Sequence, residues 1–387
     1  MSELKVGIVT KEWPPAIYGG AGVHVLQLTQ ALRTNKDVHV DVHCFGGKRD
    51  DAFGYETPSE FTSSNPAVQA IATDLEIATN LSSVDLVHSH TWYANMAGHF
   101  ASLQYSIPHI VSAHSLEPLR PWKAEQLGGG YAISSWAEKT AFEGAAAIIA
   151  VSDGMRADVL AAYPSVDPSK VVTIRNGVDT AKFAPNNDAS VPAKYGVTGP
   201  YAIFVGRITR QKGLAHLLRA WKEVPAEYGL VLAAGSPDEE GIGNEVAALI
   251  AELQSTRSNV WWIKEMLPHD QLTAMLTAAD LFICPSIYEP LGIVNLEAMG
   301  CETAVLASRV GGIPEVVSHK QTGELVDYTT DHTKFESDLT TAISSLMADP
   351  ALLEKYGKAG RARAQSEFGW DAVAAQTIAL YKSVINN

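Results

Sequence analysis

Residues 201–213, Tyr-Ala-Ile-Phe-Val-Gly-Arg-Ile-Thr-Arg-Gln-Lys-Gly, decide the interpretation of the fold, because an apolar run leads directly into a basic turn. The segment Tyr201–Val205 predicts a buried strand, and the flanking glycines predict a tight connection. Arg207 and Lys212 lie on that connection. In a doubly wound domain the carboxyl end of a strand faces the ligand, and this pair of cations favours an anionic ligand.

Short β-branched runs alternate with helical patterns on both sides of this turn. Before it, we predict strands at 6–10, 38–45, 85–90, 109–113 and 147–151, and helices at 22–33, 66–81, 93–104, 134–143 and 152–163. After it, we predict strands at 229–234, 260–263, 281–284, 304–308 and 324–326. Two such series indicate an α/β protein with two doubly wound, parallel, Rossmann-like sheets.

A stretch rich in proline and asparagine, residues 183–200, interrupts this rhythm and predicts a linker. We therefore predict an N-terminal domain over residues 1–180 and a C-terminal domain over residues 181–369, facing each other across a cleft that holds the ligands. No strand follows the last two helical patterns, 351–368 and 370–385. The final helix, about 370–387, is a candidate to pack back on the first domain.

The composition excludes several classes of protein. The 387 residues include 29 Lys and Arg against 43 Asp and Glu, a net charge of −14, which disfavours a nucleic-acid-binding protein. Neither a secretory signal nor an apolar run long enough to span a membrane is evident, and the three cysteines are widely spaced. We expect a cytoplasmic protein without disulfides or a membrane partner, and a homodimer is a candidate assembly.

A glycine loop, Tyr18-Gly-Gly-Ala-Gly22, follows the first predicted strand and opens the first helix. Such a loop lets an anion approach backbone amides, so Gly20 and Gly22 are candidates for nucleotide-sugar binding. A nicotinamide fingerprint is disfavoured because Val25 stands where its third glycine belongs and because no acid ends the second strand. A glycine turn without a ligand remains the alternative.

The third motif, Glu289-Pro-Leu-Gly-Ile-Val-Asn-Leu-Glu297, places two carboxylates eight residues apart. Gly292 stands where a helix should begin, so the amides of Leu291 to Val294 are candidates to contact a diphosphate or a sugar. A helix cap and a surface glutamate are the alternative. The acidic run 238–240 is interpreted as a solvated loop, and no Asp-x-Asp pair suited to a metal is present.

Together, the basic turn and the glutamate pair resemble the signature of retaining glycosyltransferases of the GT-B fold. Within these, residues 11–24 and 286–299 are similar to glycosyltransferase family 4, of the actinobacterial glycogen synthase and alpha-maltose-1-phosphate synthase type. The resemblance covers nearly the whole chain. It implies ADP-glucose as donor, no metal or other cofactor, and either an α-1,4-glucan or glucose 1-phosphate as acceptor. The first reading is glucan extension in glycogen biosynthesis; maltose 1-phosphate formation is its alternative.

The resemblance also implies roles for individual residues. Arg207 and Lys212 match the positions that neutralise the leaving diphosphate, and Glu289 matches the acid beside the donor sugar. Glu297 matches the position that binds the ribose hydroxyls, and His114 the histidine near the C6 hydroxyl of the sugar. A histidine satisfied within the core is the alternative for His114. We favour front-face transfer, in which a leaving phosphate oxygen acts as base.

The acceptor residues are expected in the N-terminal half. Trp92, Trp122 and Tyr131 are candidates to stack on glucose rings, with core packing the alternative for at least one of them. Arg120 and Lys123 are candidates to bind an acceptor phosphate. In residues 90–92 Thr91 replaces the acid of related glucan synthases, so no charge-based role is expected there. The rival hypotheses are a UDP- or GDP-sugar transferase acting on a lipid, a non-catalytic sugar-binding module and an inactive homologue.

Overall fold

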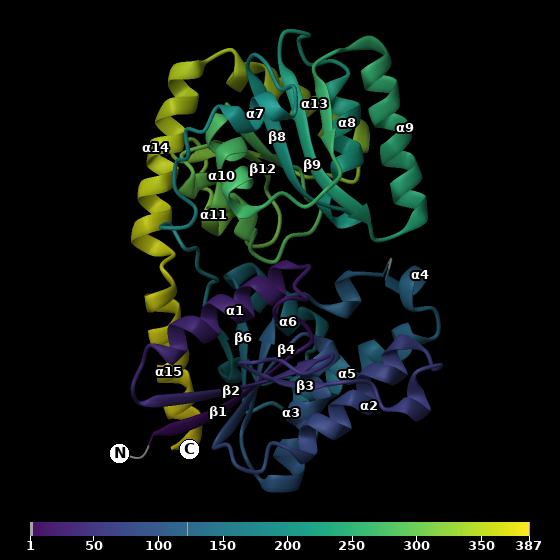
Figure 1. The fold of residues 1–387 in the computed structure, drawn as a ribbon, viewed down its shortest axis with the longest axis vertical. Helices are drawn as coiled ribbons and strands as arrows, with labels where there is room; N and C mark the ends of the chain where they lie inside the picture. The colour runs from purple at the N-terminus through teal and green to yellow at the C-terminus, as the bar shows by residue number, and fades with distance from the viewer. Residues whose placement is uncertain (1–2, 122, 387) are drawn as a thin grey trace. The chain divides into compact units, whose positions relative to one another are not determined.

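The computed structural model describes residues 3–121 and 123–386, and the chain divides into two compact units. Unit 1 comprises Met1–Gly177 and Trp370–Asn387, and unit 2 comprises Val178–Gly369. Figure 1 shows strands and helices alternating along the chain within each unit. The prediction of two parallel, doubly wound sheets is confirmed.

Unit 1 contains a sheet of seven parallel strands in the order β3-β2-β1-β4-β5-β6-β7. The strands are β1 (Leu4–Thr10), β2 (Val38–Phe45), β3 (Phe53–Tyr55), β4 (Leu86–His90), β5 (His109–Ala113), β6 (Ala147–Ala150) and β7 (Val171–Thr173). The helices are α1 (Gly20–Arg33), α2 (Pro66–Thr79), α3 (Trp92–Tyr105), α4 (Lys123–Leu127), α5 (Gly130–Gly144), α6 (Asp153–Ala162) and α15 (Trp370–Ile385).

Helix α15 belongs to unit 1 because its apolar face completes the core of that unit. Val373, Ile378 and Tyr381 are buried in one cluster with Leu28 of α1 and Ile8 of β1. This burial accounts for the helix that follows no strand: its apolar stripe is covered by α1, beside which it runs.

Unit 2 contains six parallel strands in the order β10-β9-β8-β11-β12-β13. They are β8 (Tyr201–Ile208), β9 (Gly229–Pro237), β10 (Val260–Ile263), β11 (Leu281–Cys284), β12 (Ala304–Ser308) and β13 (Gly323–Val326). The helices are α7 (Ser190–Lys194), α8 (Leu214–Trp221), α9 (Glu240–Thr256), α10 (His269–Ala278), α11 (Ile293–Gly300), α12 (Ile313–Val316), α13 (His332–Met347) and α14 (Pro350–Glu367).

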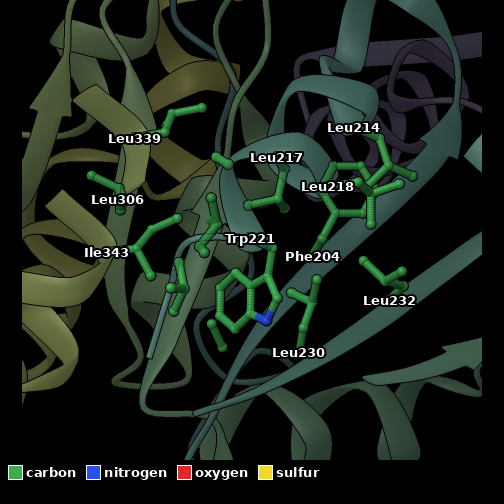
Figure 2. Close-up of a cluster of buried hydrophobic side chains, with 14 of the residues drawn as sticks. Phe204, Leu214, Leu217, Leu218, Trp221, Leu230, Leu232, Leu306, Leu339 and Ile343 are labelled. Atoms are coloured by element: carbon green, nitrogen blue, oxygen red, sulfur yellow. The ribbon is translucent and has the colours of Figure 1, made fainter. Parts of the chain in front are cut away.

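The core of unit 2 forms where α8 packs against its sheet. Trp221 is fully buried among leucines of α8 and strand residues such as Phe204 and Leu230, as Figure 2 shows. These apolar contacts hold α8 on the sheet, because burial of large apolar side chains is the main favourable contribution to folding. The turn that precedes α8 is therefore attached to a rigid layer.

The segment 183–200 is not the linker that its composition predicts. It lies within unit 2, where it contains α7, and the side-chain amide of Asn186 donates to the carbonyl of Asp270. The backbone N–H of Asn186 also donates to Thr277 at 2.9 Å. Prolines and asparagines here shape a surface connection that is packed on α10, which composition cannot distinguish from a free linker.

In both units the strand order reverses beside the first strand of the series, at β1 and β4 in unit 1 and at β8 and β11 in unit 2. Ligands of open α/β sheets bind outside the carboxyl ends of the strands at such a switch point. The carboxyl ends of β1 and β4, and of β8 and β11, are therefore the places to look for function.

Candidate active site

The basic turn of unit 2 is held by a 3-10 helix, Arg210–Lys212, between β8 and α8. Thr209 caps it by accepting from the backbone N–H of Lys212 at 3.3 Å. Gly213 ends it with φ +64°, and a Cβ there would lie 1.9 Å from the carbonyl oxygen of Pro285. Only glycine fits, so the turn can pack closely against the loop after β11.

Lys212 lies beside Glu289, as their shared switch point requires. The Lys212 Nζ donates to Glu289 Oε2 at 2.6 Å, and Ser286 Oγ donates to the same oxygen at 3.1 Å. Burial disfavours the charge on Lys212, but attraction to Glu289 outweighs it and raises the pKa of the lysine. A charged, preorganised pair therefore stands at the carboxyl ends of β8 and β11.

Arg207 is paired differently. Its Nη1 donates to both carboxylate oxygens of Asp238, at 2.7 and 2.8 Å. The Asp238 side chain is only 21% exposed, so the interpretation of residues 238–240 as a solvated loop is wrong for Asp238. The register of β8 and β9 brings this residue beside the turn, a contact that the spacing in the chain does not reveal.

The second glutamate stands within the helix predicted after Gly292. Gly292 is the N-cap of α11, which confirms the predicted helix start. The amides of Ile293 and Val294 lie in its first turn, where helical N–H groups have no partner inside the helix, and Leu291 is buried just before it. Burial raises the pKa of Glu297 to about 7, although Lys212 opposes this.

In unit 1, three imidazoles gather at the carboxyl ends of β4 and β5. His90 ends β4, His114 follows β5, and their ring nitrogens Nδ1 and Nε2 lie 2.9 Å apart. His24 of α1 packs edge-on against His114, with ring centroids 4.7 Å apart, and against Trp370. Sequence reasoning singled out His114 alone, although His24 and His90 stand in the motifs that carry the family resemblance.

Burial keeps these imidazoles uncharged at neutral pH. It lowers the pKa of His114 to about 4 and, with the neighbouring imidazoles, the pKa values of His24 and His90 well below their usual range. Neutral imidazoles can donate to and accept from a sugar hydroxyl. One ligand atom from each of the three lies within 4.8 Å of the others, so the cluster has the residue types and spacing to hold a metal ion.

The glycine loop of unit 1 is occupied by a carboxylate of the same chain. Glu12 accepts from the backbone N–H groups of Tyr18 and Gly19 at 2.9 and 2.8 Å. A Cβ on Gly22 would lie 2.6 Å from the same carboxylate, so this position needs glycine for close approach to Glu12. Gly20 opens α1 beside it. Sequence reasoning missed Glu12, which fixes the loop as an acid at a helix N-terminus.

The aromatic and basic candidates of unit 1 have different surroundings. Trp92 is only 3% exposed and packs in a core cluster, so the structure does not support a stacking role for its ring. Tyr131 packs on the same cluster, and its hydroxyl donates to the carbonyl of Glu117 at 2.7 Å. Arg120 donates to Ser115 Oγ at 2.9 Å. Trp122 lies outside the described residues.

The described residues contain no helix long and apolar enough to cross a membrane. Their cysteines, Cys44, Cys284 and Cys301, are all buried and free of disulfides.

Comparison with known proteins gives matches over both units. Residues 191–363 match the family described as glycosyl transferases group 1, and residues 18–182 match glycosyltransferase family 4. The chain is 51% identical to the alpha-maltose-1-phosphate synthase of Mycolicibacterium smegmatis, covering 98% of this chain and 100% of that protein. It is 27% identical to the glycogen synthase of Mycobacterium tuberculosis, covering 98% of this chain and 94% of that protein.

Among solved structures, the sucrose-phosphate synthase of Thermosynechococcus elongatus superimposes with a TM-score of 0.84 at 24% identity, covering 99% of both chains. This likeness extends over the described fold from end to end, and it concerns the fold alone.

Proposed function

The chain belongs to glycosyltransferase family 4, and on that premise we propose that it transfers glucose from ADP-glucose to glucose 1-phosphate, forming maltose 1-phosphate. The observation that supports this acceptor best is 51% identity over the full chain to an alpha-maltose-1-phosphate synthase, against 27% to a glycogen synthase. The comparisons thus favour formation of maltose 1-phosphate, which was the alternative prediction from the sequence. Glucan extension becomes the second candidate.

The donor half of this proposal rests on unit 2. Lys212 and Arg207 supply positive charge where negative charge grows on the leaving diphosphate, and the first turn of α11 offers amides to the same group. Glu289, already positioned by Lys212 and Ser286, is assigned to the donor sugar, and Glu297 to the ribose hydroxyls. These cations supply the electrostatic stabilisation without a metal.

We further propose that transfer retains the anomeric configuration. The acceptor O4 forms its bond to the anomeric carbon on the face from which the diphosphate departs. The bond from that carbon to the phosphate oxygen breaks, and the same phosphate takes the proton of the acceptor hydroxyl. His114, uncharged at neutral pH, is assigned to the C6 hydroxyl of the donor glucose, which a neutral imidazole can contact without proton transfer. The free cysteines suit a cytoplasmic enzyme.

The test mixes the protein with glucose 1-phosphate and ADP-, UDP- or GDP-glucose, and then measures release of the nucleoside diphosphate. We expect release from ADP-glucose that depends on glucose 1-phosphate, with an α-linked disaccharide phosphate identified by NMR. No turnover with any of the three donors would contradict the proposed activity. A β-linked product would contradict retention alone.

A further inference from the structure

Two lysines from distant parts of unit 1 converge on one aromatic ring at the switch point of its sheet. Lys11 follows β1, and its Nζ lies 3.7 Å from the ring centroid of Tyr93 in the first turn of α3. Lys123, which begins α4 and is buried, places its Nζ 5.7 Å from the same centroid. Two ammonium groups are thus gathered beside the junction of β4 and α3.

Lys11 carries its charge in a partly buried position, and the part of the chain that the structure describes supplies no acid to pair with it. Among the residues that the structure describes, no carboxylate lies within ion-pair distance of its Nζ. Glu12, the adjacent acid, directs its carboxylate to the amides of Tyr18 and Gly19 instead. Burial lowers the pKa of Lys11, although Glu12 opposes the shift. A desolvated cation of this kind gains from an anionic ligand.

The residue at the junction itself adds no negative charge. Thr91 is the N-cap of α3 and adopts φ +67° and ψ 156°, a conformation that is an outlier for a β-branched residue. Backbone strain of this kind concentrates at ligand sites. An acid at position 91 would stand two residues before Tyr93, whose ring lies near both lysines.

We propose that Lys11 and Lys123 bind the phosphate of the acceptor and thereby select a sugar phosphate over a neutral glucan end. Arg120, on the same connection as Lys123 and anchored to Ser115, supplies a third cation. This inference rests on the proposed function and names the part of the acceptor that the enzyme recognises. The ligand chemistry is a phosphate monoester, which free inorganic phosphate shares.

The test uses Lys11→Met and Lys123→Met, which remove the charge and keep most of the apolar stem. The control is Lys36→Met, an exposed lysine in the turn before β2, which lies at the amino ends of the strands, whereas Lys11 follows the carboxyl end of β1. For each variant, KM is measured for glucose 1-phosphate and for ADP-glucose in one preparation. The ratio of the two KM values does not depend on the fraction of the protein that is folded. A partly misfolded variant therefore still shows whether binding of glucose 1-phosphate is weakened.

We expect each substitution to raise the KM for glucose 1-phosphate about tenfold to a hundredfold relative to the KM for ADP-glucose, the size of a lost charge-assisted hydrogen bond. Inorganic phosphate should inhibit the parent enzyme competitively against glucose 1-phosphate and should inhibit both variants more weakly. Lys36→Met should behave like the parent. An unchanged KM ratio in both variants would overturn the inference, and would leave the proposed function standing if the parent enzyme is active with glucose 1-phosphate.

A second pair of variants adds charge instead of removing it. Thr91→Asp places a carboxylate at the N-cap of α3, a position where aspartate is favourable and where positive φ is tolerated better than by threonine. Thr91→Asn is the uncharged control of the same shape. We expect the KM for glucose 1-phosphate to rise at least about tenfold in Thr91→Asp relative to Thr91→Asn. Equal KM values in the two variants would contradict the phosphate site.

Discussion

At the switch point of unit 1, β1 and β4 lead into a loop held by its own Glu12 and into imidazoles that burial keeps uncharged. At the switch point of unit 2, β8 and β11 lead instead into the charged pair of Lys212 and Glu289. The strand order around the two points is the same. Topology thus places a site in both sheets, and the side chains that follow the strands decide its ligand. The charged pair of unit 2 suits a diphosphate, whereas unit 1 combines imidazoles that suit a sugar hydroxyl with the two lysines, Lys11 and Lys123, that we propose bind the acceptor phosphate.

The largest expected effect lies in the charged site. Lys212→Ala should lower kcat by about a hundredfold to a thousandfold, because it removes a preorganised cation at the leaving group. The matched control is Lys222→Ala, whose lysine lies after α8 and forms an exposed ion pair with Glu252. Circular dichroism and thermal melting establish that both variants are folded. Near-normal turnover of folded Lys212→Ala would remove the diphosphate role and with it the contrast between the two sites.

A smaller effect is expected from Glu297→Gln, which should raise the KM for ADP-glucose about tenfold or more by weakening hydrogen bonds to the ribose. Because the pKa of Glu297 is raised to about 7, the parent enzyme should bind ADP-glucose more tightly as the pH rises through 7 and the carboxylate ionises. In Glu297→Gln this pH dependence should disappear. Glu354→Gln, on an exposed position of α14, is the control. A pH-independent KM in the parent would contradict the ribose role.

The two units should also respond to acid with opposite signs. Buried histidines of unit 1 have lowered pKa values, so below about pH 6.5 the unfolded chain binds more protons and stability falls as the pH falls. They are His24, His43, His88, His90, His109 and His114, and they outnumber the acids with raised pKa values there, Asp74, Glu138 and Asp158. In unit 2, Glu297 and Asp280 have raised pKa values, so their contribution to stability is lost as the pH rises from about 4 toward 7.

Hydrogen exchange resolved by peptide can measure both units in one experiment. Between pH 7 and pH 5, after correction for intrinsic exchange, opening of β4 and β5 should increase at least about tenfold. Opening of β8 and β11 should not increase. Equal acid sensitivity of the two sheets would show that the buried histidines are not the cause.

The smallest effect is expected from a metal chelator. If the imidazoles act as neutral hydrogen-bonding groups, dialysis against EDTA should change kcat by less than about twofold. Activity lost with EDTA and restored by Zn²⁺ or Mg²⁺ would show that a metal is required. Loss restored by Zn²⁺ alone would point to the group formed by His24, His90 and His114.

Local sequence patterns predicted most of the fold and the charged site. Apolar runs followed by glycine predicted β8 and its turn, and Gly292 predicted the start of α11. Strands β3 and β7, of three residues each, were missed because their pattern is too short to detect. Their place is set by pairing with β2 and β6, which is a tertiary contact.

Apart from Glu12, whose partners Tyr18 and Gly19 are close in the chain, the missed contacts share one physical cause, since each joins residues that are far apart in the chain. Asp238 meets Arg207 through strand register, and Lys11 meets Lys123 over Tyr93 across more than one hundred intervening residues. Trp92, in turn, is covered by a cluster that includes Ala67 and Leu127. A sequence shows that such residues are present, but their neighbours are decided by packing.

The acceptor is the centre of this account, and competition tests it most directly. The enzyme is incubated with ADP-glucose labelled in its glucose and with both acceptors together. Glucose 1-phosphate and the chain ends of glycogen are present at the same concentration, and the products are separated and identified by mass. We predict that labelled glucose appears in maltose 1-phosphate. Label recovered in glycogen, with none in a disaccharide phosphate, would contradict the account.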